Sequence, residues 1–168
     1  MRQFLFSLIA ALAFIPPAFA DAFIAHCVSV TDGDTIKVLA PDKHLLILRL
    51  QGIDCPEKKQ AFGMRAKQFT SGLVFNNDVV VEPMGRDRYG RTIADVRLKD
   101  GTSVNYALVK NGYAWWYRKY SNDPRLANFE EQARKGHLGL WSAPRAEAPW
   151  DFRKAERDHA LTSHAQPE

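Results

Sequence analysis

Five short β-forming segments most strongly limit what this chain can fold into. Residues 23–31 alternate between apolar and polar side chains, and the Asp-Gly turn at 32–34 that follows them is a strong hairpin signal. Residues 35–40 and 45–53 are two further runs rich in β-branched and aliphatic residues. The first third of the chain therefore predicts a three-stranded meander.

The remaining elements alternate between helical and β patterns. Residues 62–75 repeat apolar side chains at helical spacing, and residues 78–83 and 91–98 form the fourth and fifth β-type runs. Residues 103–112 and 123–136 predict two more helices. Five strands, with one helix after the third and two after the fifth, favour an α+β fold built on a five-stranded OB-type barrel with three helices.

The N-terminal segment has the pattern of a secretory signal peptide. Arg2 precedes an apolar run at 4–14, which prolines end at 16–17, and residues 18–20 read Ala-Phe-Ala. We expect cleavage after Ala20, because small residues occupy the positions that a signal peptidase reads. The alternative is an uncleaved membrane anchor, but the run is shorter than the roughly 20 residues that span a bilayer.

The rest of the chain predicts one domain over 21–142, followed by a polar, Pro-containing tail over 143–168 that we expect to be flexible. The full chain has a formal charge of +4, and without Arg2 the charge is +3. This mild excess suits a polyanionic partner without requiring one. We expect an exported protein, periplasmic or secreted, that is monomeric and free of the membrane after cleavage.

The cysteines allow two interpretations. Cys27 and Cys55 are the two cysteines of the chain, and export would permit a disulfide between them. Free, buried thiols are equally compatible with the sequence, because cysteine also serves as a small core residue. A structural zinc site is not expected, since the two cysteines lie far apart in the sequence and the histidines do not cluster around them.

Charged residues collect in three predicted turns, at 32–34, 49–57 and 85–91. Each cluster alone has an ordinary explanation as solvated loop chemistry. Burying such charges costs several kcal/mol unless they are paired or bound, so the combination of these charged turns around one barrel suggests a common site.

The acidic residues of these turns suggest a metal site. Asp34 and Asp54 supply hard oxygen ligands, which suit Ca²⁺ or Mg²⁺. A backbone carbonyl at Cys55 could complete the protein's share of the coordination.

Basic and aromatic residues of the same turns suggest phosphate chemistry. Arg49 and Arg91 carry planar guanidiniums that match phosphate oxygens. Glu57 is a candidate general base for a water molecule, and Tyr89 offers an aromatic face to a nucleotide base. Together with a divalent cation, these groups would suffice for phosphodiester hydrolysis.

One geometric condition must hold for this site to form. Side chains alternate along a strand, so Arg49 and Asp54, five positions apart, would point to opposite faces. They can converge only if the backbone bends between them, and Gly52 and Pro56 favour such a bend.

The chain resembles the thermonuclease, or staphylococcal nuclease-like, family. The stretches that carry the resemblance are "VTDGDTIKV", "LRLQGIDCPE", "RDRYGRTIADV", "VNYALVKNGYAWWYRKY" and "HLGLWS". They cover about residues 25–141 in the family's order and spacing. The resemblance implies an OB-fold and a Ca²⁺-dependent endonuclease that acts on DNA and RNA and leaves 3′-phosphates.

The resemblance also implies a role for each matching residue. Asp34 and Asp54 would be the calcium carboxylates, with the backbone carbonyl of Cys55 as a further ligand and Asp32 near the metal. Arg49, Glu57 and Arg91 would be the catalytic residues. Substrate-binding positions would be Arg88 and Tyr89, with Tyr117 and Tyr120 as candidates for an aromatic that holds the base.

Two other functions are compatible with parts of the pattern. A non-catalytic nucleic-acid-binding barrel would use the basic and aromatic residues, but it would have no use for Asp34, Asp54 and Glu57. A glycosidase built on a carboxylate pair would leave Arg49 and Arg91 without a task. The nuclease hypothesis uses all five residues.

Overall fold

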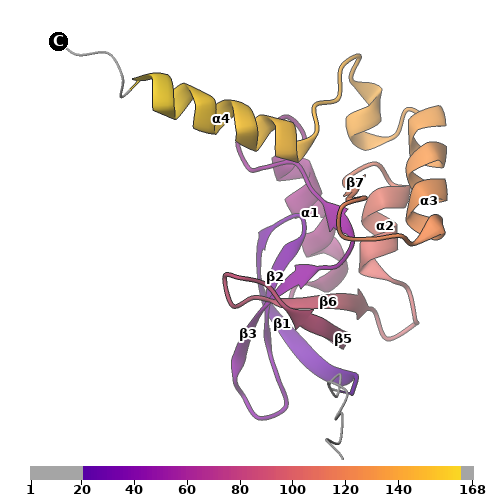
Figure 1. The fold of residues 1–168 in the computed structure, drawn as a ribbon. Coiled ribbons are helices and arrows are strands. Elements are labelled where there is room, and N and C mark those ends of the chain that lie inside the picture. Colours follow the sequence, from indigo (N-terminus) through magenta and orange to yellow (C-terminus); the bar gives the residue numbers. More distant parts are fainter. Residues whose placement is uncertain (1–20, 164–168) are drawn as a thin grey trace, which may run out of the picture.

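The computed structural model describes residues 21–163 and has a closed barrel at its centre (Figure 1). The barrel strands are β1 (Phe23–Asp32), β2 (Thr35–Leu39), β3 (Leu45–Leu50), β5 (Asp78–Arg86) and β6 (Thr92–Arg97). Their order around the barrel is β1-β2-β3-β6-β5, and β1 pairs with β5 to close it. All neighbours are antiparallel except β3 and β6, which are parallel. The predicted α+β barrel of five strands is confirmed.

Alternation along the strands fills the barrel interior. Every barrel strand contributes small or branched apolar side chains that are almost fully buried, as inward positions of a small barrel require. These residues are Ala25, Cys27, Ile36, Val38, Leu48, Leu50, Val79, Val81, Ala94 and Val96.

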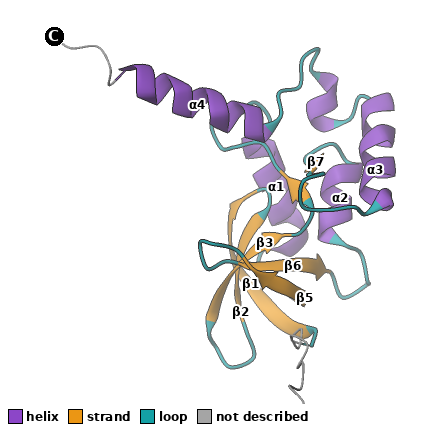
Figure 2. Cartoon of the chain, viewed as in Figure 1, coloured by secondary structure: helices purple, strands orange, loops and turns teal. Residues whose placement is uncertain are grey.

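The helices that the sequence predicts are all present, and Figure 2 labels them α1, α2 and α3. They are α1 (Gly63–Val74), α2 (Val104–Lys110) and α3 (Pro124–Lys135). α1 packs against β1, and α2 packs against both β6 and α3. The Thr70 side chain of α1 donates a 2.6 Å hydrogen bond to the carbonyl of Gly33, so the first helix holds the turn between β1 and β2.

A second, very small sheet was not expected. β4 (Ile53–Asp54) pairs antiparallel with β7 (Trp115–Trp116), and Asp54 lies opposite Trp115. This pairing ties the bend after β3 to the segment between α2 and α3. Residues 112–120 are therefore held next to the end of β3.

The segment after residue 142 differs from the flexible polar tail that the sequence predicts. A short 3₁₀ turn (Gly139–Ser142) is followed by a fourth helix, α4 (Pro149–Ser163). The start of α4 packs on the protein and its C-terminal half extends away from it (Figure 1). Its polar composition gave no apolar stripe for periodicity to detect.

Two further expectations concern the membrane and the cysteines. Across residues 21–163, no helix has the length and apolar character needed to cross a bilayer. The predicted signal peptide, residues 1–20, lies outside the described residues. Cys27 and Cys55 are both free and buried. Of the two interpretations, the structure therefore agrees with free thiols in the core and not with a disulfide.

Candidate active site

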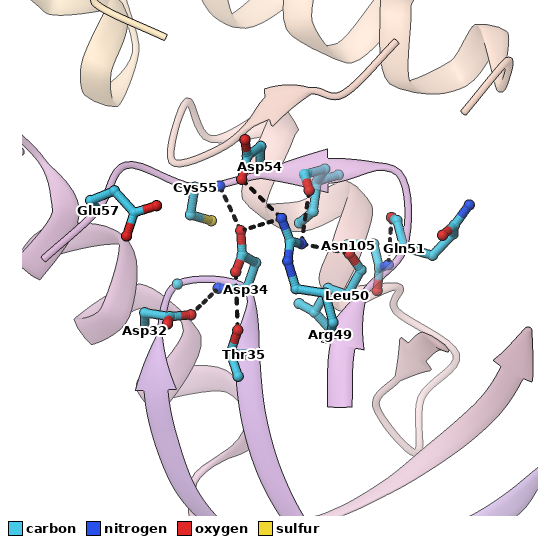
Figure 3. Close-up of polar contacts among 12 residues, drawn as sticks. Asp32, Asp34, Thr35, Arg49, Leu50, Gln51, Asp54, Cys55, Glu57 and Asn105 are labelled. Carbon is cyan, nitrogen blue, oxygen red and sulfur yellow. Dashed lines mark hydrogen bonds and ion pairs between the residues drawn. The ribbon is translucent and has the colours of Figure 1, made fainter. Parts of the chain in front are cut away.

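The site is organised around the guanidinium of Arg49, at the end of β3 (Figure 3). Its Nη1 donates to the carbonyls of Leu50 and Ile53, at 2.9 and 2.8 Å. Its Nη2 lies 2.9 Å from Asp54 Oδ1 and 3.1 Å from Asp34 Oδ2. One buried side chain therefore fixes the backbone of the bend and draws two carboxylates together.

A sharp bend between β3 and β4 makes this convergence possible. Gly52 has a φ of 75°, a left-handed conformation that glycine adopts without strain. Its amide oxygen accepts a hydrogen bond from the Tyr117 backbone N–H at 2.9 Å. Arg49 and Asp54 consequently reach the same side, as the sequence analysis required.

Asp34 reaches the site from the turn between β1 and β2. Its Oδ2 accepts a 2.7 Å hydrogen bond from the backbone N–H of Cys55, and its Oδ1 accepts from the Thr35 hydroxyl at 3.3 Å. Its own N–H donates to Asp32 Oδ1 at 3.3 Å. Gly33 is packed so closely that a Cβ there would lie 2.7 Å from the Cβ of Cys55. The turn thus has little freedom to move Asp34 away.

Burial and neighbouring charges shift the pKa values of several groups in this cluster. Burial, with the neighbouring charge of Asp34, raises the pKa of Asp32 to about 6. Burial also raises the pKa of Asp54, although the nearby guanidiniums favour its charged form. For Arg49, burial acts to lower the pKa, but the charges of Asp34 and Asp54 outweigh it and the pKa is raised. Burial therefore opposes the charged forms of Asp32 and Asp54, and a bound cation would favour them.

The donor set fits a hard divalent cation. Asp34 and Asp54 each place an oxygen beside the same Arg49 nitrogen, and carboxylate oxygens are preferred by Ca²⁺ and Mg²⁺. Burial raises the pKa of the Cys55 thiol well above its usual value, so the thiol is neutral and unsuited to a metal. No group of three or more acidic, His or Cys side chains within residues 21–163 is arranged to hold a metal. Backbone carbonyls and waters would have to supply the remaining ligands, and the assignment of the Cys55 carbonyl stays a prediction.

Glu57 lies beside this cluster, with its carboxylate on the same side as Asp34 and Asp54 (Figure 3). Its backbone N–H donates to Gln60 Oε1 at 3.1 Å, which fixes the start of the loop that leads to α1. The Glu57 side chain is 38% exposed, in contrast to the buried aspartates. A carboxylate that is partly open to water is suited to accept a proton from it.

The predicted residues of the β5–β6 loop form a separate group. Arg91 Nε lies 2.7 Å from Asp87 Oδ2, and Asp87 Oδ1 accepts from the Tyr89 and Arg91 backbone N–H groups at 2.9 and 3.0 Å. Arg88 donates to the Tyr89 hydroxyl at 2.7 Å, and Tyr89 is 69% exposed. Arg91 directly precedes β6, whose register sets Thr92 beside Leu48 of β3. The structure therefore brings Arg91 to the neighbouring strand, but its ion pair is with Asp87.

The predicted aromatic positions lie next to the bend, where the Tyr117 N–H donates to the Gly52 carbonyl and the Tyr120 carbonyl accepts from the Gln51 side chain. Tyr117 and Tyr120 contact each other edge to face, with ring centroids 4.7 Å apart. Tyr117 also stacks on Trp150 of α4, at 5.2 Å and 12° between the ring planes. Tyr120 is 56% exposed, whereas Tyr117 is covered on one face.

The sequence analysis missed Arg153, which completes the cluster from α4. Arg153 Nη2 lies 2.7 Å from Asp54 Oδ2, and Nη1 lies 2.7 Å from Glu57 Oε1. The available signal was Trp150 with Phe152 in an otherwise polar tail, since large aromatic side chains are seldom left without packing. That signal points to a docked segment, but it does not reveal which carboxylates the segment meets.

Comparisons with known proteins show the family to which the chain belongs. Residues 47–143 match the family described as staphylococcal nuclease homologue. Protein ParB of Escherichia coli is 42% identical over 156 residues, which cover 87% of each chain. The micrococcal nuclease of Shigella flexneri is 41% identical over 152 residues, 84% of this chain and 86% of its own. An uncharacterized endonuclease of Escherichia coli O157:H7 is 42% identical over 126 residues, 75% and 82% of the two chains. The chain belongs to the staphylococcal nuclease homologue family.

Proposed function

We propose that this protein is an exported, Ca²⁺-dependent endonuclease that hydrolyses phosphodiester bonds of DNA and RNA and leaves 3′-phosphates. A nuclease of the thermonuclease type follows from the family that the chain belongs to. The dependence on Ca²⁺, the action on both DNA and RNA, and the export of the protein are proposed here in addition. The main supporting observation lies at one end of the barrel. There Arg49 Nη2 lies 3.1 Å from Asp34 Oδ2 and 2.9 Å from Asp54 Oδ1.

The geometry supports a division of labour among the acidic residues. Asp34 and Asp54 are buried and fixed by Arg49, so they are suited to hold a cation. Glu57 is partly exposed and is suited to take the proton of the attacking water. A bound divalent cation would supply charge stabilisation for the phosphate oxygens.

The basic residues would act on the same phosphate. Arg49 presents a guanidinium that its two backbone carbonyl contacts hold in place, and such a fixed fork stabilises negative charge as it develops. Arg91 would approach from β6 after exchanging its Asp87 partner for a phosphate oxygen. Arg88 with the exposed Tyr89 would contact the adjoining nucleotide.

The chemical step is a hydrolysis in which water attacks phosphorus. Glu57 accepts the water proton as the new P–O bond forms, and the bond from phosphorus to the 5′ oxygen breaks. The 5′ oxygen leaves with a proton taken from solvent, and the phosphate stays on the 3′ oxygen.

The decisive experiment is a cleavage assay with purified protein on single-stranded DNA and on RNA. We expect cleavage with added Ca²⁺, no cleavage in excess EDTA, and products whose 3′ ends carry phosphate. Parallel reactions with Mg²⁺ and Mn²⁺ establish which cation supports turnover. Undiminished cleavage in excess chelator would refute the metal role. Tight nucleic-acid binding without cleavage under any of these cations would instead support the non-catalytic binding module.

A further inference from the structure

The first two turns of α4 lie directly on the candidate active site. Arg153 faces Asp54 with both terminal nitrogens, because Nη2 lies 2.7 Å from Oδ2 and Nη1 lies 3.3 Å from Oδ1. The same Nη1 lies 2.7 Å from Glu57 Oε1. One guanidinium thus bridges a predicted metal ligand and the predicted general base.

The contacts around Arg153 seat only one end of the helix. Trp150 stacks on Tyr117 and meets Trp115 edge-on at 5.5 Å. Just before the helix, the carbonyl of Glu147 accepts a 2.7 Å hydrogen bond from Gln60 Nε2. Residues 154–162 are all exposed. The start of the helix is therefore attached through a short aromatic and ionic contact.

This contact is incompatible with the roles proposed for the two carboxylates. Asp54 Oδ1 is shared by Arg49 and Arg153, and Oδ2 is taken by Arg153 alone. A divalent cation needs at least one of those oxygens free of guanidinium hydrogens, and with Arg153 docked neither Asp54 oxygen is free. With Arg153 Nη1 at 2.7 Å from its Oε1, Glu57 has one carboxylate oxygen less to accept a hydrogen bond from the attacking water.

We propose that Arg153 is a built-in cation that competes with the divalent metal for Asp54 and Glu57, and that α4 thereby inhibits the enzyme until metal displaces it. The proposal rests on the function proposed above. Bidentate arginine–carboxylate pairs are strong enough to favour the closed arrangement, and the partial exposure of Arg153, 33%, leaves it a route to solvent.

The size of the effect follows from population arithmetic. If α4 is docked in about nine molecules of ten, the apparent metal affinity is weakened about tenfold relative to a site that is always open. Because metal and Arg153 cannot occupy Asp54 together, bound metal must in turn displace α4.

Calorimetric titration of Ca²⁺ without nucleic acid tests the competition directly. We expect Arg153→Gln to bind Ca²⁺ about tenfold more tightly than the unmodified chain. Arg157→Gln, which removes the same charge one turn further along the exposed part of α4, should leave the affinity unchanged. Equal affinity in Arg153→Gln and Arg157→Gln would overturn the proposal.

A second variant separates docking from charge. Trp150→Ala leaves every charge in place but removes the stacking on Tyr117, so it should also tighten Ca²⁺ binding. Unchanged or weaker Ca²⁺ binding in Trp150→Ala, with a thermal unfolding curve that shows a folded protein, would contradict α4 as the competing element.

Cleavage rates supply the third readout and distinguish this inference from the proposed function. Arg153→Gln should cleave faster than the unmodified chain at limiting Ca²⁺ and at the same rate at saturating Ca²⁺. A lower rate at saturating Ca²⁺ would make Arg153 a substrate contact and overturn the inhibition. If Arg153→Gln tightens Ca²⁺ binding but no chain cleaves, the nuclease proposal fails and the competition stands. If every chain cleaves and no variant shifts the Ca²⁺ affinity, only the competition fails.

Discussion

At the residue scale, Arg49 is the group on which the site depends. It is largely buried, and its two terminal nitrogens meet two backbone carbonyls and two carboxylates. Loss of its side chain would leave buried Asp34 and Asp54 facing each other without this partner, which costs about 3–5 kcal/mol when a buried ion pair is broken. Variants of Arg49 would therefore mix catalysis with folding, and more exposed residues give cleaner tests of mechanism.

Glu57 is such a residue. Glu57→Gln keeps the shape of the side chain but removes the carboxylate that would accept a proton from water. We expect turnover on single-stranded DNA at saturating Ca²⁺ to fall by at least about a hundredfold. The control is Glu131→Gln, a change on the exposed face of α3 that loses an ion pair with Lys135. Near-normal turnover in Glu57→Gln would remove Glu57 from the mechanism.

Gly33 fixes the position of Asp34 through lack of space. A Cβ at Gly33 would lie 2.7 Å from Cys55 Cβ and 2.9 Å from Ala66 Cβ, and these buried atoms have little room to move. We expect Gly33→Ala to lower the free energy of unfolding by about 1–3 kcal/mol and to weaken Ca²⁺ binding. Urea unfolding and calorimetric titration measure the two effects.

The matched control for this substitution is Gly72→Ala in α1, where nothing lies within 4 Å of an added Cβ. Because alanine is the better helix former, this change should raise the free energy of unfolding by about 0.5–1 kcal/mol. If Gly33→Ala proved as stable as Gly72→Ala, the turn would be less tightly packed than the distances indicate.

At the element scale, the regular pattern of the chain was predictable and the docking of its pieces was not. Runs of β-forming residues predicted the five barrel strands, helical spacing predicted α1, and capping and stop residues predicted α2 and α3. β4 and β7 contain two residues each, too few for any period to register. α4 was not predicted because Trp150 and Arg153 contact partners that lie far away in the sequence. Local sequence patterns do not encode such contacts.

The candidate site could likewise be predicted only in part from the sequence. Residue chemistry identified Asp34, Asp54 and Arg49, and the bend at Gly52 was recognised as the condition for their convergence. The partner of Arg91 was not recognised, although Asp87 lies four residues before it. An i,i+4 pair is easily read on a helix, but in a turn the contact depends on backbone geometry that the sequence does not display.

The N-terminus of α3 illustrates how a single element is stabilised. Asp123 caps the helix by accepting from the Arg125 N–H at 3.0 Å, and it also accepts from the Tyr106 hydroxyl at 2.6 Å. Its hydrogen bonds with the Arg125 side chain lower the pKa of Asp123 to about 2. We expect Asp123→Ala to reduce the free energy of unfolding by about 1–2 kcal/mol at pH 7.

The pH dependence of this loss has a defined sign. The folded pKa lies below the ordinary value of 3.8, so the carboxylate contributes stability above that value and loses it as the pH falls toward about 2. The difference in unfolding free energy between Asp123→Ala and the unmodified chain should shrink over this interval. Asp123→Asn, which retains a capping oxygen, should lose less at pH 7. A difference that stayed constant from pH 7 to pH 2 would exclude the charge of Asp123 as its source.

At the scale of the whole molecule, one end of the barrel gathers segments that lie far apart in the chain. The turn at 32–34, the bend at 49–57 and α4 all meet there. The opposite part of the body carries the first residues of β1, where Phe23 pairs with Val81 of β5. The start of β1 is thus separated from the candidate site by the barrel itself.

This separation bears on the predicted export of the protein. β1 begins at Phe23, so cleavage after Ala20 would remove none of the barrel. Expression of the full chain in a bacterium with a secretory pathway should yield an exported protein whose intact mass corresponds to residues 21–168. Ala18→Arg places a large charged residue at a position that the peptidase reads, and it should leave the uncleaved precursor. An unmodified chain that kept Met1 and remained with the membrane fraction would instead support the anchor. Cleavage beyond Phe23 would break the β1–β5 pairing that closes the barrel, so an N-terminus at Asp21 is also the one most compatible with a folded enzyme.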